Sequence, residues 1–133
     1  MTPLTPCTIG LGSNTPDKAE RIEHALNFLK ELLSDCSASD VYESEAFNGV
    51  DAPYMNAVVH GHSPLSYEKT LACLKDYEEQ QGRRKEEAEG GVVSIDLDLV
   101  IWDFHIKRPK DFERHYFNHG YAQLLAHGAF QEE

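Results

Sequence analysis

The sequence has few cysteines, few basic residues and no long apolar segment. Its three cysteines, Cys7, Cys36 and Cys73, are odd in number and lack metal-ligand spacing, which predicts small core residues in a reducing compartment. Lys and Arg number 12 against 23 Asp and Glu, and the formal net charge of -11 argues against a nucleic-acid-binding surface. No apolar run approaches the length of a membrane span, and no basic-plus-apolar leader is present. We therefore expect a cytoplasmic protein without a nucleic-acid or membrane partner.

The chain also lacks internal repeats and Pro-, Gly- or Ser-rich linkers, so its 133 residues predict one domain over positions 1–133. The patterns along it predict strands at 7–11, 37–44, 55–62 and 95–102, helices at 16–33 and 67–81, and a short helical segment at 116–125. This β-α-β-β-α-β order with a C-terminal appendage is typical of the ferredoxin-like α+β fold. Such a fold has an antiparallel sheet with both helices packed on it.

Local signals set the expected ends of the two main helices. Thr15 is predicted as the first N-cap, with Pro16 at the first helical position. The second helix is expected to start within 63–66 and to end at Gly82 as its C-cap. The charged segment 83–91, which ends in paired glycines, predicts a mobile loop.

The most informative segment of the sequence is Ile95–Trp102. It is typical of a buried strand, yet Asp96 and Asp98 interrupt it. Side chains two apart on a strand share a face, so the two carboxylates are expected about 7 Å apart. A hard cation such as Mg²⁺, which takes one or two carboxylates plus phosphate oxygens, would relieve their repulsion. The alternative is a strand end with two solvated aspartates.

Other polar groups admit both a functional and a structural interpretation. The cations of 83–85, about a dozen residues before the aspartates, suit a polyphosphate, or form a solvated charge run. Tyr54 and Asn56 suit the face and edge of a heterocycle, or are a core tyrosine and a capping amide. His60 and His62 share a strand face suited to a transition metal, although spacing gives no third ligand. The segment 12–14 lacks the length and lysine of a P-loop, which favours a structural turn.

Together these segments resemble the 6-hydroxymethyl-7,8-dihydropterin pyrophosphokinases of folate biosynthesis. Four blocks, which span about residues 7–102, carry the resemblance: Leu-Gly-Ser-Asn at 11–14, Tyr-Met-Asn-Ala-Val-Val at 54–59, Glu-Glu-Gln-Gln-Gly-Arg at 78–83 and Ile-Asp-Leu-Asp-Leu at 95–99. The resemblance implies transfer of diphosphate from ATP to the pterin hydroxymethyl group, with release of AMP. It also implies small-molecule substrates and a monomer.

The resemblance implies a role for each matching site residue. Asp96 and Asp98 would hold two Mg²⁺ ions, and Arg83 and Lys85 would close on the phosphates. Glu78, His115 and Tyr116 would contact the nucleotide. The pterin ring would lie between Tyr54 and Tyr121, with Asn56 at its edge and the backbone of Ser44 to Phe47 completing the pocket.

The chain also departs from the family pattern at four positions. Valine stands at Val93, where the family has the arginine of a Gly-Pro-Arg segment. A loop tryptophan is replaced by Gly90, a pterin-side proline by Glu45, and an arginine beside the stacking aromatic by His119. Loss of one preorganised cation costs on the order of 10²- to 10³-fold in rate. The alternative function is therefore an impaired paralogue that binds a pterin or nucleotide without turnover.

Overall fold

The structure is a computed structural model of the chain and describes residues 3–45, 52–82 and 93–128. The predicted loop at 83–91 lies outside these residues. The elements, in chain order, are β1 (Thr5–Ser13), α1 (Lys18–Leu32), β2 (Ser34–Ala38), β3 (Tyr42–Ser44), β4 (Tyr54–Ser63), α2 (Tyr67–Gln80), β5 (Asp96–Trp102), β6 (His105–Ile106), α4 (Pro109–Phe112) and α5 (His115–Ala126).

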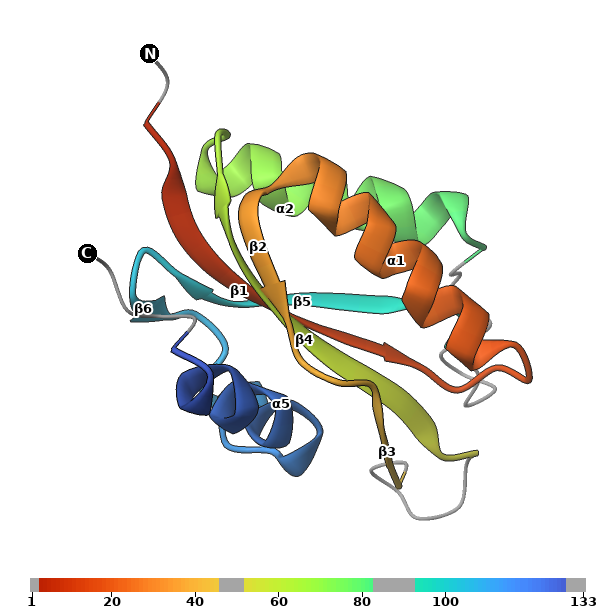
Figure 1. Ribbon diagram of the computed structural model, residues 1–133. Helices are drawn as coiled ribbons and strands as arrows, with labels where there is room; N and C mark the ends of the chain where they lie inside the picture. The colour runs from red at the N-terminus through yellow and green to blue at the C-terminus, as the bar shows by residue number, and fades with distance from the viewer. Residues whose placement is uncertain (1–2, 46–51, 83–92, 129–133) are drawn as a thin grey trace.

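The strands form one antiparallel sheet at the centre of the molecule. Their order is β2-β4-β1-β5-β6, and β3 pairs with the other end of β4 (Figure 1). The long strand β1 lies between β4 and β5, so residues from three distant parts of the sequence meet across it. This arrangement confirms the predicted α+β ferredoxin-like fold.

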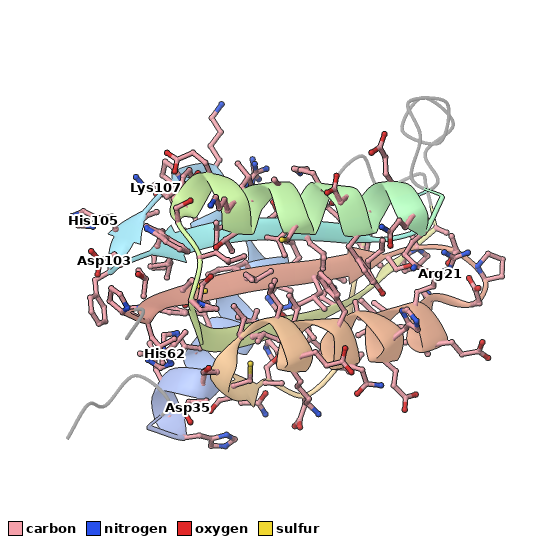
Figure 2. The ribbon with its side chains drawn as sticks, turned by 90° about the horizontal axis from the view of Figure 1, so that it is seen from above. Arg21, Asp35, His62, Asp103, His105 and Lys107 are labelled. Atoms are coloured by element: carbon pink, nitrogen blue, oxygen red, sulfur yellow. The ribbon has the colours of Figure 1, made fainter. Side chains whose placement is uncertain are left out.

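Helices α1 and α2 cover one face of the sheet, as Figures 1 and 2 both show. Arg21 of α1, labelled in Figure 2, donates from Nη1 to the carbonyl oxygen of Gln81 at 2.8 Å and so ties α1 to the end of α2. The main hydrophobic core lies beneath both helices, and the inward side chains of the strands build it. It includes Ile9, Leu11, Ile22, Leu29, Ala57, Val59, Leu74, Leu97 and Leu99.

Helix α5 packs on the opposite face of the sheet (Figure 1). A second, smaller core joins it to β4 and β5 and consists of Val58, Val100, Ile101, Phe117 and Leu124. Gly120 permits the close approach, since a Cβ at this position would lie 2.7 Å from Val58 Cγ2. The predicted C-terminal helical segment therefore covers part of the face that the two main helices leave open.

Some element boundaries differ from those predicted. Helix α1 has Asp17 as its N-cap, so the predicted cap at Thr15 is wrong. The Thr15 hydroxyl donates instead to Asp17 Oδ1 at 2.6 Å, in a turn closed by the bond from Lys18 N to Thr15 O. For α2, Ser66 is the N-cap and accepts from Lys69 N at 3.2 Å, in agreement with the predicted start.

The predicted strand over 37–44 is divided into β2 and β3. Ser39 lies at the break, where its hydroxyl accepts from Val58 N at 2.9 Å and its own N–H donates to Val58 O. Strand β6 follows β5 through a two-residue turn at Asp103 and Phe104, whose φ values are 50° and 65°. Neither residue is glycine, so this hairpin lacks the usual turn signal.

Of the three cysteines predicted as core residues, only Cys7 is buried, whereas Cys36 and Cys73 are half-buried. Cys7 is 1% exposed in the main core, and all three thiols are free. Within the described ranges, no helix combines the length and the apolar character needed to cross a membrane.

Candidate functional site

Two glycines of β1 form the floor of a cavity on the face covered by α5. Gly12 pairs with Asn56 on β4 and with Asp96 on β5, while Gly10 pairs with Val58 and Asp98. Because side chains alternate along a strand, this row faces away from the main core. The absence of side chains at these two positions of β1 leaves a cavity of about 340 Å³ between β4, β5 and the C-terminal segment.

Aromatic rings border the cavity floor at both glycines. A Cβ at Gly10 would lie 3.1 Å from Cδ1 of Phe117, and a Cβ at Gly12 would lie 3.4 Å from Cδ2 of Tyr54. Phe117 is 1% exposed, whereas Tyr54 lies at the open end of β4 and is partly exposed. The cavity therefore offers ring surfaces to a flat ligand.

Asp96 and Asp98 project into this cavity from β5, as the sequence predicts. Leu97 and Leu99, which alternate with them, are buried in the main core on the other face. Burial, together with the charge of Asp96 nearby, raises the pKa of Asp98 well above its usual range. The pair is therefore poised to gain from a cation.

Three further residues of the C-terminal segment line the same cavity, and one of them, Arg108, contacts Asp98. Arg108 Nη2 lies 3.5 Å from Asp98 Oδ1, and Arg108 Nε donates to one carboxylate oxygen of Asp111. The other oxygen of Asp111 accepts a hydrogen bond from the hydroxyl of Tyr116. Burial and the Asp111 carboxylate raise the pKa of the Tyr116 phenol, so the hydroxyl keeps its proton.

Tyr116 is among the site residues predicted from the sequence, whereas Arg108 and Asp111 are not. Arg108 is the N-cap of α4 and Pro109 occupies its first turn, so Asp111 lies three residues on and faces back to Arg108. The Arg-Pro-x-Asp pattern is a recognisable helix start. It does not reveal that the helix start lies against β5.

The donor set is suited to a magnesium ion that is shared with a ligand. In the described ranges, no three His, Cys, Asp or Glu side chains are grouped so that they could hold a metal ion by themselves. Two carboxylates on one strand face are nevertheless the usual protein share of a Mg²⁺ site, which takes its other oxygens from water and phosphate. Asp96 and Asp98 fit that share.

Asn56 is fixed at the other side of the cavity floor. Its amide nitrogen donates to Ser44 Oγ at 2.8 Å and to the carbonyl oxygen of Tyr42 at 3.3 Å. Its Oδ1 therefore turns toward Gly12, where it lies 3.5 Å from the position that a Cβ would occupy. Asn56 is only 2% exposed, so its orientation is set before any ligand arrives.

The turn predicted over 12–14 is wrong for its first two residues, because Gly12 and Ser13 end β1 and only Asn14 lies beyond the strand. Ser13 Oγ donates to Ser94 O at 2.6 Å, and Asn14 exchanges bonds with Val93 through its N–H and its Oδ1. These bonds anchor the chain just before β5. Val93, the position of the family arginine, is 9% exposed and takes part in this anchor.

Glu78, predicted to contact a nucleotide, supports β5 from the helix side. Its Oε2 accepts from Leu97 N at 2.8 Å and its Oε1 lies 3.1 Å from Lys75 Nζ. The bonded N–H lies between the two aspartates in sequence. Glu78 thereby fixes the segment that carries them, while its contact with a nucleotide stays a prediction.

Some predicted residues lie away from this cavity or outside the description. Tyr121 contacts Phe112 and Phe117 and lines a separate hollow of about 140 Å³ that includes His60. His115 is exposed, with its ring 5.4 Å from that of His119. Phe47, Arg83 and Lys85 are among the residues that the structure does not describe.

His60 and His62 share a strand face, as predicted, with ring centroids 5.5 Å apart. His60 Nδ1 lies 3.0 Å from Thr8 Oγ1, and the ring is 5% exposed. Burial, and to a lesser degree His62, lowers the pKa of His60 to about 4. Over the described ranges this pair has no third ligand, so the transition-metal interpretation gains no support.

Comparisons with known proteins identify one family. The family described as 7,8-dihydro-6-hydroxymethylpterin-pyrophosphokinase matches residues 8–126. A 2-amino-4-hydroxy-6-hydroxymethyldihydropteridine pyrophosphokinase of Aquifex aeolicus is 32% identical over 103 residues, which are 77% of this chain and 64% of that protein. One from Pseudomonas putida is 29% identical over 114 residues, 84% of this chain and 94% of that protein.

Another relative is a folate synthesis bifunctional protein of Chlamydia caviae, 28% identical over 101 residues, which are 71% of this chain and 23% of that protein. The chain thus spans less than two thirds of the Aquifex and Chlamydia relatives. The match nevertheless covers β1 to α5 and includes the whole cavity. The chain belongs to the 7,8-dihydro-6-hydroxymethylpterin-pyrophosphokinase family.

Proposed function

We propose that this protein transfers diphosphate from ATP to 6-hydroxymethyl-7,8-dihydropterin, a step of folate biosynthesis, and releases AMP. The observation that carries the proposal is the position of Asp96 and Asp98 in one cavity with Arg108, opposite Asn56 and Tyr54. A metal–phosphate subsite and a flat-ring subsite then lie side by side across β1. The names of the family and of its relatives, which print a pyrophosphokinase and a hydroxymethyldihydropterin, support the proposal.

The ring subsite would be formed by Tyr54, Asn56 and Ser44. Asn56 Oδ1 can accept a hydrogen bond from the amino or ring N–H groups of a pterin, because its amide nitrogen is already directed to Ser44 and Tyr42. Tyr54 supplies a ring for stacking. Phe117 lines the same cavity from α5, so we assign the second aromatic contact to Phe117 in addition to the predicted Tyr121.

The phosphate subsite would be formed by Asp96, Asp98 and Arg108. Asp96 and Asp98 would hold Mg²⁺, which would supply charge neutralisation for the phosphate oxygens. The pterin hydroxyl oxygen forms a bond to the β-phosphorus of ATP and releases its proton to solvent, the bond from that phosphorus to the oxygen bridging to the α-phosphorus breaks, and AMP leaves. Arg108 can donate to the phosphates through its guanidinium. Arg83 and Lys85 stay predicted phosphate-binding cations. The predicted roles of His115, Tyr116 and Phe47 in ligand binding also stay predictions.

AMP release from ATP and Mg²⁺, measured with and without 6-hydroxymethyl-7,8-dihydropterin, tests the proposal. We expect AMP only when the pterin is present, and loss of at least 10³-fold in rate for Asp98→Asn. Asp76→Asn is the control, because this exposed aspartate of α2 lies on the helix-covered side. Equal AMP release with and without pterin would overturn the proposed acceptor.

The alternative of a pterin- or nucleotide-binding module has one observation in its favour. Val93, at the position of the family arginine, is buried and its backbone is bonded to Asn14, so it has no cation to offer. A module of this kind would bind the pterin and ATP by calorimetry but release no AMP. The affinity of such a module for the pterin and ATP would be unchanged in Asp98→Asn. An enzyme that binds Mg-ATP through Asp98 would lose affinity for Mg-ATP in the same variant.

A further inference from the structure

Arg108 is held between two carboxylates in the cavity. Its guanidinium contacts Asp98 through Nη2 and Asp111 through Nε, and the side chains of these two aspartates are only 13% and 15% exposed. The Arg108 side chain is 47% exposed. A long side chain with that much access to solvent loses rotamer freedom when it is held in one place. Its position therefore depends on the groups that bind it.

Asp111 is oriented to bind Arg108 and not a metal ion. One of its oxygens accepts from Arg108 and the other accepts from Tyr116, so both are engaged by donors of the same C-terminal segment. In the part of the chain that the structure describes, Asp111 does not form a three-residue metal group with Asp96 and Asp98. Its contacts give it the geometry of a clamp on the guanidinium.

The charges of this group are unbalanced. Asp96, Asp98 and Asp111 bring three carboxylates to one guanidinium, and their like charges are felt at Asp98. A single divalent cation would balance the group, and a cation bound to Asp98 Oδ1 would meet Arg108, whose Nη2 lies 3.5 Å from that oxygen. Two cations that share one carboxylate oxygen repel each other, so binding of one weakens binding of the other.

We propose that Asp111 is a positioning residue that holds Arg108 as the internal counter-ion of Asp98, and that Arg108 yields this place when a divalent cation binds. Asp111 then keeps Arg108 at the cavity, where its guanidinium is available to the anionic ligand that accompanies the metal. This inference rests on the proposed role of Asp98 as a metal ligand.

Binding of Mn²⁺ alone, without nucleotide or pterin, tests the competition by electron paramagnetic resonance on the full chain. We expect Arg108→Gln to bind Mn²⁺ roughly three- to tenfold more tightly than the wild type, because a competing charge is removed. Lys110→Gln is the matched control, since it removes an exposed cation of α4 that does not line the cavity. Unchanged affinity in Arg108→Gln, or an equal gain in Lys110→Gln, would overturn the competition.

A double-mutant cycle with Asp111→Asn separates a clamp from a metal ligand. If Asp111 acts through Arg108, its replacement changes Mn²⁺ affinity differently in the wild-type and Arg108→Gln backgrounds, by about two- to fivefold. If Asp111 were itself a ligand, the same loss would be found in both backgrounds. Equal losses would therefore overturn the positioning role.

The two proposals fail in different ways. If Asp98→Asn binds Mn²⁺ as well as the wild type does, the metal role of Asp98 fails, and the inference fails with it. If Asp98→Asn loses Mn²⁺ while Arg108→Gln leaves its affinity unchanged, only the inference about Arg108 and Asp111 fails. Absence of pterin-dependent AMP release would overturn the reaction but would not affect the Mn²⁺ measurements.

Discussion

The two faces of the sheet use the same strands for opposite purposes. Along β5, Leu97 and Leu99 fill the main core beneath α1 and α2, while Asp96 and Asp98 face the cavity beneath α5. Along β4, Ala57 and Val59 lie on the first face, and Asn56 and His60 lie on the second. One face gains stability from apolar burial, whereas the other keeps charges and imidazoles in places where burial penalises them.

This difference shows that the cavity face lowers the stability of the fold and that the helix-covered face compensates for it. A buried carboxylate or a neutral buried imidazole destabilises the folded state relative to an apolar side chain of the same size. The helix-covered face offsets that cost with a continuous core. Changes on the two faces should therefore affect stability and ligand binding in opposite ways.

Leu97→Ala tests the helix-covered face and should have the largest effect on the free energy of unfolding. Leu97 lies between the two aspartates in sequence, but its side chain is fully buried in the main core on the other face of the sheet. Its truncation leaves a cavity in that core. We expect the free energy of unfolding in urea to fall by about 2–5 kcal/mol. A loss below about 1 kcal/mol would mean that this face does not carry the stability.

His60 makes the cavity face sensitive to acid. Its pKa in the folded protein is about 4, so below the unfolded value of about 6.5 the unfolded chain takes up a proton that the folded chain refuses. Stability from this residue is complete above pH 6.5 and falls as the pH drops toward 4. We expect His60→Gln to remove about 2–3 kcal/mol of the loss between pH 7 and pH 4, measured by urea unfolding at each pH.

The control for His60 is His127→Gln, which removes an exposed imidazole at the end of α5. This change should leave the acid-induced loss of stability as it is in the wild type. An equal improvement in both variants would show that the buried position of His60 is not the cause.

Asp98→Asn should raise stability in the absence of a divalent cation. The carboxylate is 13% exposed and lies near Asp96 and Asp111, so a neutral amide of the same shape removes repulsion and a cost of burial. The gain is limited by the lost contact with Arg108, and we expect about 1–3 kcal/mol at pH 7 by urea unfolding. A variant less stable than the wild type would indicate that the Arg108 contact outweighs the burial cost.

Alanine substitutions at two glycines, one on each face of the sheet, should have the smallest effects on stability. A Cβ at Gly12 would meet Tyr54 at 3.4 Å in the cavity, whereas a Cβ at Gly61 would meet Cys36 Sγ and Leu33 Cβ at 3.0 Å on the helix-covered face. We expect Gly12→Ala to change unfolding by less than about 0.5 kcal/mol and Gly61→Ala to cost about 1–2 kcal/mol.

Binding should show the reverse order for these two variants. Gly12→Ala narrows the cavity floor and should weaken binding of the dihydropterin by roughly tenfold in calorimetry. Gly61→Ala, once folded, should bind as the wild type does. Equal loss of binding in both variants would contradict the assignment of the two faces.

The sequence was a good guide where one strand or helix contains the whole signal. The alternation in 95–102 is enough to place Asp96 and Asp98 on the face opposite to Leu97, because strand geometry fixes that relation. The helix start within 63–66 was predictable for the same local reason, and Ser66 is its N-cap. Tyr54 and Asn56 also suited a heterocycle from their chemistry alone, and the structure places both in the cavity with the aspartates.

The C-terminal segment was a poor guide because its contacts are distant in sequence. Arg108 and Asp111 read as an ordinary helix start, and only the packing of α4 and α5 on β5 brings them to Asp98. Phe117 lines the cavity because its side of α5 faces Gly10, whereas the predicted Tyr121 lines a separate hollow. No periodicity reveals which turn of a helix meets which strand.

The family, the order of the main strands and helices and the charged face of β5 follow from the sequence, because they depend on local patterns and short-range geometry. The cavity that two glycines leave between β4 and β5, and the position of Arg108 and Asp111 beside the aspartates, follow only from the tertiary structure. These features depend on strand register and on helix docking. Both are set by how the cores on the two faces of the sheet pack, which involves the whole chain at once.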